Sequence, residues 1–204
     1  MTRRIAFVSI LLLLAVFAAN AASAAQNATE TIRQAVEDVL KIIDKTNMQD
    51  PAQREAMHRA VERRVEAIFD FEEFSARTVG PKWRQFTPDQ KKRFENAFAE
   101  LLRRTYVAKM DDYDGGGGVK FLGEVASTKG DRVEVQSAVM VKNQEIPVAY
   151  RLFDKGGVWR VYDVRIENIS LVENYRSQFK ELLLKGDAEE LIRKVEEKSK
   201  ETQR

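Results

Sequence analysis

The chain has 204 residues, with 34 basic and 32 acidic side chains, a single histidine and no cysteine. A protein that holds nucleic acid electrostatically needs a basic excess or a clear basic stripe. A formal net charge of +2 supplies neither, so we expect no nucleic-acid partner. The lack of cysteine excludes disulfides and thiolate metal sites, so the fold must depend on packing alone.

The first 24 residues have the organisation of a secretory signal peptide. Arg3 and Arg4 form a short basic region, residues Ile5 to Ala19 are almost wholly apolar, and Ala22-Ser23-Ala24 is a small-residue cleavage site. The apolar stretch is too short to favour spanning a bilayer, although an uncleaved membrane anchor is the alternative. We therefore expect export to a periplasm. The mature chain, residues 25–204, would carry 32 basic and 32 acidic side chains and form a single domain.

Six capping boxes predict where helices begin. In this device a short polar side chain binds an N–H of the first turn, while Glu or Gln three residues later reaches back. The six are Asn27…Glu30, Asp50…Gln53, Asp70…Glu73, Thr87…Gln90, Ser170…Glu173 and Asp187…Glu190. An apolar pattern of helical period follows each of them. The longest helix is expected to begin at Pro88 and to end before the glycines at 115–118.

After the glycines the apolar period changes from 3.6 to 2, which indicates strands. Three sets alternate: Val119, Phe121 and Val125; Val133, Val135, Ser137, Val139 and Val141; Ile146, Val148, Tyr150 and Leu152. Short turns separate them, so we predict an antiparallel meander with one buried face. A fourth strand-like run begins at Trp159 and leads through Ser170 into two last helices. The fold class is α+β, with N-terminal helices over a curved antiparallel meander and further helices at the C-terminus.

The sequence offers few groups for catalysis. His58 lies among charged neighbours on a predicted helix, and every Ser-His-Asp or Cys-His triad would depend on it. Asp163 lies within an otherwise apolar strand, where a buried carboxylate needs a partner, and Arg160, Arg165 or Arg176 could supply one. We interpret Asp163 as half of a structural ion pair. The alternative is a catalytic acid or base. We predict no metal, no cofactor and no enzymatic activity.

Two segments resemble a known family. They are FDFEEFSARTVGPKWRQFTPDQKKRFENAFAELLRRTY, residues 69–106, and VWRVYDVRIENISLVENYRSQF, residues 158–179. Both are similar to the MlaC, or toluene-tolerance, family of periplasmic lipid-binding proteins. The resemblance extends over essentially the whole mature chain. One departure is Asn168, where the family commonly has glycine, and asparagine tolerates a positive φ better than most residues.

The resemblance implies a soluble shuttle that carries phospholipid and performs no covalent chemistry. Such proteins work between an outer-membrane lipoprotein complex and an inner-membrane ABC transporter with an MCE-domain subunit, and so maintain the lipid asymmetry of the outer membrane. The acyl chains would occupy an apolar cavity between sheet and helices. The expected lipid-binding side chains are Phe98, Leu101, Leu102, Tyr106, Val135, Val139, Val148 and Tyr150. The pattern does not fix the inward side of the last strand, so Val161 and Val164 are both candidates.

Three other functions stay open at this point. The cargo could be a hopanoid-like or other unusual lipid, because apolar pockets discriminate between such ligands only modestly. A cone-shaped α+β domain could instead be a hydrolase or isomerase that uses Asp163. A structural or assembly factor would have a tightly filled core. Apolar periodicity identifies the inside of the fold but does not show whether the inside is hollow.

Overall fold

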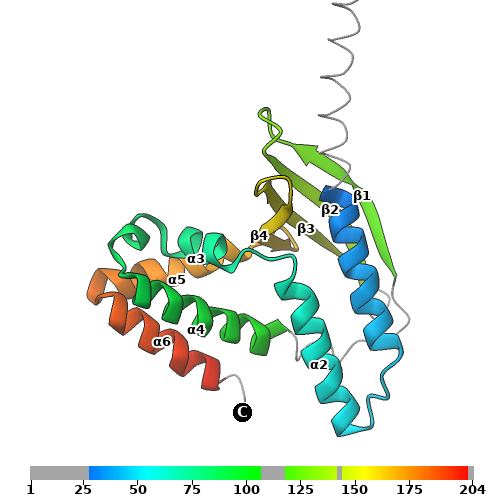
Figure 1. Cartoon of the computed structure of the whole chain (residues 1–204), viewed down its shortest axis with the longest axis horizontal. Helices are drawn as coiled ribbons and strands as arrows, with labels where there is room; N and C mark the ends of the chain where they lie inside the picture. The colour runs from blue at the N-terminus through cyan, green and yellow to red at the C-terminus, as the bar shows by residue number, and fades with distance from the viewer. Residues whose placement is uncertain (1–27, 107–117, 142–143, 202–204) are drawn as a thin grey trace, which may run out of the picture.

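The computed structural model describes residues 28–106, 118–141 and 144–201 (Figure 1). The predicted signal peptide, Asn27 and the glycines at 115–117 lie outside the described residues. An N-terminal helix over residues 28–44 comes first. The later elements are α2 (Pro51–Glu66), α3 (Phe71–Val79), the 3-10 helix η1 (Gly80–Gln85), α4 (Pro88–Tyr106), β1 (Val119–Ala126), β2 (Arg132–Val141), β3 (Gln144–Asp154), β4 (Trp159–Ile166), β5 (Ile169–Ser170), α5 (Leu171–Lys185) and α6 (Ala188–Glu201). Among these helices none is long and apolar enough to cross a membrane, a finding that covers the described residues alone.

The capping boxes predicted the helix starts correctly wherever the structure describes them. At the start of α4, the Gln90 N–H donates to Thr87 Oγ1 at 3.2 Å and the Thr87 N–H donates to Gln90 Oε1 at 3.0 Å. The other four described caps, Asp50, Asp70, Ser170 and Asp187, each accept from the N–H of the residue three positions later. The local sequence therefore sets these boundaries before any packing is considered.

The sheet is an antiparallel meander in the order β1-β2-β3-β4-β5, as predicted. One expected detail is wrong. Phe121 pairs with Ser137 but Gly123 pairs with Gln136, so one extra residue forms a β-bulge in β1. A shift of one residue reverses the direction of every later side chain. Val125 therefore does not share the buried face of Phe121 but points outward and is 59% exposed.

The buried apolar side chains form two main cores. The first joins the sheet to the N-terminal helix, whose Ala28 and Ile32 are fully buried against Val135 and Val161. The second lies among α3, η1, α4, α5 and α6, which form the helical layer to the left in Figure 1. The predicted α+β architecture is thus confirmed, with helices placed both over the sheet and beside it.

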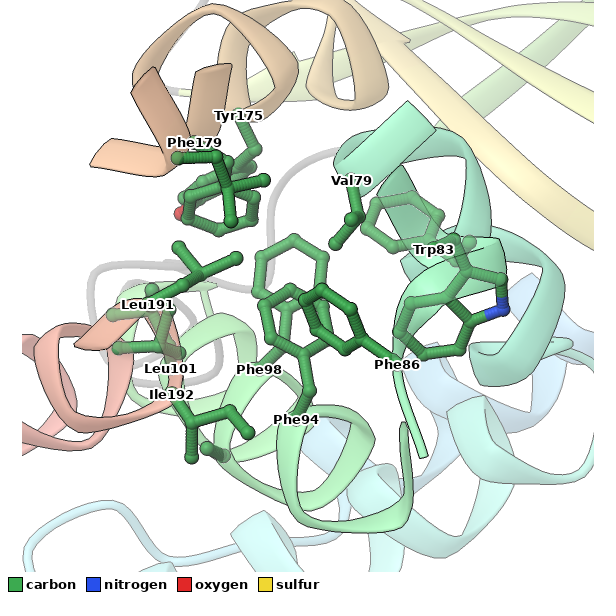
Figure 2. Close-up of a cluster of buried hydrophobic side chains, with 14 of the residues drawn as sticks. Val79, Trp83, Phe86, Phe94, Phe98, Leu101, Tyr175, Phe179, Leu191 and Ile192 are labelled. Carbon is green, nitrogen blue, oxygen red and sulfur yellow. The ribbon is translucent and has the colours of Figure 1, made fainter. Parts of the chain in front are cut away.

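The helical core is built on aromatic rings (Figure 2). Phe94 and Phe98 of α4 are fully buried at its centre. The ring of Phe98 meets Tyr175 at 4.9 Å and Phe179 at 5.2 Å between centroids, both edge to face. Such pairs add to the burial energy of the rings, so this layer is a firm body against which other elements can be positioned.

A third, smaller cluster holds α2. Met57 and Val61 of α2 are buried against Ile43 near the end of the N-terminal helix. These two helices form a hairpin, in which the N-terminal helix lies along the sheet and α2 lies between that helix and α4 (Figure 1). The space around this hairpin contains the candidate site.

Candidate functional site

Two adjoining cavities flank α2. The sheet cavity, about 410 Å³, lies between the N-terminal helix, α2 and the inner face of the sheet. The helix cavity, about 380 Å³, lies between α2, α3, α4 and β4. Val65, Phe69, Tyr106 and Ile166 line both cavities. Each volume falls within the range of known small-molecule sites, about 300–1,000 Å³.

The walls of the sheet cavity are mostly aliphatic. Alternate residues of the strands point into it, because the side chains on one face of a strand repeat every second residue. Opposite them, the C-terminal half of the N-terminal helix contributes a stripe at helical spacing. The strand residues are Val119, Val139, Val141, Ile146, Val148 and Tyr150, and the helix residues are Ala35, Val36, Val39, Leu40 and Ile43.

The helix cavity has an apolar interior and a charged mouth. Phe69, Phe71, Phe74, Leu102, Val164 and Leu171 form the interior. The charged and polar residues on its wall are Glu62 and Glu66 from α2, and Asn96, Glu100 and Arg103 from α4. An apolar molecule with one polar end would find both environments in this cavity.

Arg103 organises the carboxylates of the mouth. Its Nε lies 3.0 Å from Glu62 Oε1 and 2.8 Å from Glu100 Oε2. Burial raises the pKa of Glu62, against the opposing effect of the Arg103 guanidinium, and nearby Glu66 and Glu100 raise it further. Burial would also raise the pKa of Glu100, but hydrogen bonds from Arg103 and Arg104 lower it. In the mouth, the surroundings therefore favour the charged form of Glu100 and disfavour the charged form of Glu62.

Tyr106 and Tyr150 contribute hydroxyl groups to the cavity walls, and these are uncharged at neutral pH. Tyr175, a hydrogen-bond partner of Tyr106, lies in the helical core. Burial raises the pKa of the Tyr106 phenol, and a hydrogen bond with Tyr175 opposes this rise. Burial also raises the pKa of Tyr150, against a hydrogen bond with Ser137, and the pKa of Tyr175 to about 12. The walls thus combine apolar surface with neutral hydroxyls that already have partners inside the protein.

Six of the ten lipid-binding candidates lie on cavity walls. Leu102, Tyr106 and Val164 line the helix cavity, and Tyr106, Val139, Val148 and Tyr150 line the sheet cavity. The other four are packed in the cores instead: Phe98 and Leu101 in the helical core, and Val135 and Val161 against the N-terminal helix. For the last strand, the register places both Val161 and Val164 on the inner face, opposite Leu152 and Tyr150, because a bulge separates them.

The sequence did not predict many of the residues that line the two cavities. The stripe of Val36, Val39, Leu40 and Ile43 was visible as an amphipathic helix, but its pattern did not distinguish a cavity wall from a core face. Phe69 lies in the connection between α2 and α3, and Ile166 ends β4, so periodicity gives no signal for either residue. Their position between the two cavities becomes apparent only in three dimensions.

Asp163 has a structural setting and lines neither cavity. It is 1% exposed and accepts hydrogen bonds from the Ser170 hydroxyl at 2.7 Å, the Val172 N–H at 3.1 Å and Arg151 Nη1 at 3.2 Å. The ion pair was predicted, but its partner was not. Arg151 lies opposite Asp163 in the β3–β4 register, and none of the three arginines that the sequence suggested pairs with it.

The turn at residues 167–168 leads to Ser170, the N-cap of α5, and it agrees with the expectation for Asn168. Asn168 has φ of 67° and the preceding Glu167 has φ of 51°. These values lie in the left-handed region, which asparagine adopts more readily than most residues. The expectation that Asn168 tolerates the turn is confirmed. The turn places Ser170 where its hydroxyl both caps α5 and contacts Asp163.

An open sheet, helices over it and two adjoining apolar cavities define a class of protein built to hold an apolar molecule between sheet and helices. Within this class the chain belongs to the MlaC family, whose profile, described as MlaC protein, matches residues 33–197. The chain is 26% identical to the toluene tolerance protein ttg2D of Pseudomonas putida over 158 residues, which are 76% of this chain and 73% of that one.

A solved structure is also similar. It is the phospholipid-binding protein from Ralstonia solanacearum in complex with a phospholipid, with a TM-score of 0.78 and 26% identity. The match covers 87% of this chain and 99% of that one. The fold of the described residues is therefore one that, in the Ralstonia protein, accompanies a bound phospholipid.

Proposed function

We propose that this protein is a periplasmic phospholipid carrier that holds acyl chains in the helix cavity and the sheet cavity. It receives and delivers lipid between an outer-membrane lipoprotein complex and an inner-membrane ABC transporter with an MCE-domain subunit, and so maintains outer-membrane lipid asymmetry. The observation that carries the proposal is the pair of adjoining apolar cavities within an MlaC fold. The phospholipid bound by the similar Ralstonia protein supports the choice of cargo.

The energetics explain why such a carrier needs a cavity. Each CH₂ group of an acyl chain exposed to water costs about 0.8 kcal/mol, so a two-chain lipid crosses water very slowly without a carrier. Phe69 and Tyr106 stand between the two cavities. A division of this kind suits two flexible chains of one lipid, which favours phospholipid over a rigid polycyclic cargo. The charged mouth of the helix cavity suits the polar head group.

We infer that the protein acts by binding and not by catalysis. The acid that the sequence singled out, Asp163, is held by three donors and lies away from both cavities. Its hydrogen bonds join β3, β4 and the start of α5, so we infer that its role is structural.

Filling the cavities tests the proposed function. Val148→Phe in the sheet cavity and Ala99→Phe in the helix cavity add volume to walls that are only partly buried. We expect the double variant to bind a fluorescent phospholipid at least about tenfold more weakly, while its melting temperature stays near that of the wild type.

Val125→Phe is the matched control, because it makes the same type of change on the outer face of the same sheet. It should bind lipid as the wild type does. Unchanged lipid binding in the folded double variant would contradict the proposal that these cavities hold the cargo.

A further inference from the structure

The two long sides of α2 are attached to the rest of the protein in different ways. On one side, Met57 and Val61 pack into an apolar cluster with Ile43 of the N-terminal helix. On the same side, Arg64 Nε lies 2.9 Å from Asp38 Oδ2. This seam combines apolar burial with an ion pair, so α2 and the end of the N-terminal helix form one unit.

On its other side α2 faces α4 across a polar seam. Glu62 Oε1 lies 3.0 Å from Arg103 Nε, and both side chains are about one-third exposed, 31% and 33%. Among the described residues, none from α2 belongs to the buried cluster of the helical core. The α2–α4 seam therefore lacks the apolar burial that holds the other side of α2.

The helix cavity lies directly behind this polar seam. Glu62, Val65 and Glu66 of α2 form one side of it, and Ala99, Leu102 and Tyr106 of α4 belong to the other. Because Val65 and Tyr106 also line the sheet cavity, a separation of α2 from α4 would give access to both cavities.

The ends of the hairpin have firm anchors about which it can move. Ile32 near the start of the N-terminal helix is fully buried against the sheet. After α2, the Asp70 N–H donates to the Val161 carbonyl at 2.9 Å and the Val161 N–H donates to the Ile68 carbonyl at 2.8 Å. We therefore expect any movement to be confined to the part of the hairpin between these anchors, which lines both cavities.

We propose that lipid enters and leaves through the seam between α2 and α4, and that the Glu62–Arg103 ion pair is the latch of this portal. The inference rests on the proposed carrier function. A partly exposed ion pair is a modest restraint, so the latch holds the portal closed most of the time and yields without unfolding any core.

Chemical cross-linking tests the portal, and the absence of native cysteine makes every introduced pair unique. One double variant, Glu62→Cys with Arg103→Cys, is joined across the α2–α4 seam by a short bis-maleimide. The control, Asp38→Cys with Arg64→Cys, is joined in the same way across the α2–N-terminal helix seam. It replaces a similar ion pair on the side expected to remain closed. Arg64 also lines the sheet cavity, so only the effect of the link itself, and not of the substitutions, is compared. Each protein capped with N-ethylmaleimide is its own reference.

The readout is exchange of a fluorescent phospholipid from the loaded protein into phosphatidylethanolamine–phosphatidylglycerol vesicles. We expect the 62–103 link to slow exchange at least about tenfold and the 38–64 link to change it less than about twofold, since only the first closes the portal. Exchange that is unaffected by the 62–103 link, or slowed equally by both links, overturns the proposal. Failure of the carrier function itself would be distinct, because the unlinked protein would then hold no phospholipid in its native mass spectrum.

Charge removal tests the latch. Glu62→Gln should speed exchange by up to about fivefold, the scale of a partly exposed ion pair. Glu55→Gln is the control, because Glu55 pairs with Arg59 at 2.9 Å within α2 and lies outside both cavities. No increase for Glu62→Gln, or an equal increase for both variants, contradicts the latch.

Discussion

At the scale of single residues, Asp163 shows how a buried charge can fix an architecture. Its carboxylate accepts from Arg151 on β3 and from Ser170 and the Val172 N–H at the start of α5. Removal of an acceptor from a buried ion pair leaves its donors without partners, which costs more than the pair itself contributes.

We predict that Asp163→Asn lowers the free energy of unfolding by about 3 kcal/mol in urea titrations. The amide has a single acceptor oxygen, so it cannot replace both Oδ1, which accepts from the Val172 N–H, and Oδ2, which accepts from Arg151 and Ser170. The exposed Asp44→Asn is the control and should have almost no effect. The folded fraction of Asp163→Asn should still bind phospholipid. A variant that kept full stability but lost a hydrolase or isomerase activity of the wild type would instead support the hypothesis that Asp163 is catalytic.

Asp70 makes stability depend on pH. It caps α3 through the Glu73 N–H and lies 2.6 Å from Lys155 Nζ. Burial alone would raise the pKa of Asp70, but Lys155 and the Glu73 N–H together lower it below the ordinary 3.8. A lowered pKa means that the folded protein favours the charged form, so this stabilisation is present above the unfolded pKa and is lost as pH falls through the folded value.

We expect Asp70→Asn, which keeps a capping oxygen, to cost about 1 kcal/mol at pH 7 through loss of the ion pair with the half-exposed Lys155. Urea titrations at a series of pH values should show the difference from the wild type constant above about pH 4 and shrinking below it. A difference that is the same at pH 7 and pH 2.5 would show that the Asp70 charge has no role.

At the scale of elements, the sequence predicts helices better than sheet details. Capping residues such as Thr87 and Asp187 act on their own first turn, so they can be read locally. The bulge in β1 depends on how β1 aligns with β2, which is a long-range choice. For the same reason, the sequence indicated that Asp163 needs a partner but did not identify Arg151 on the neighbouring strand.

The bulge itself can be tested through its glycine. Gly123 has φ of 136°, which L-residues rarely adopt, and an added Cβ would meet no atom within 4 Å. We predict that Gly123→Ala lowers the free energy of unfolding by about 1–3 kcal/mol through backbone strain alone. Gly118→Ala meets equally open space without a positive φ and should be close to neutral. Equal thermal stability of the two variants would contradict the bulge.

At the scale of the whole molecule, the hollow interior is a property that periodicity could not predict. Phe98 and Val139 both belong to apolar faces, yet Phe98 is fully buried among rings and Val139 borders the sheet cavity. The difference arises because the N-terminal helix and α2 leave a cavity on each side of α2, one against the sheet and one against α4. Interiors otherwise pack tightly, so persistent apolar cavities of this size indicate a ligand site.

The most direct test of the carrier function is a native mass spectrum of the predicted mature protein, residues 25–204, purified from a periplasmic extract without detergent. We predict a mass above that of the polypeptide, and fragmentation of the excess mass into phospholipid. A spectrum of the bare polypeptide that stays unchanged after incubation with phospholipid vesicles would contradict the account.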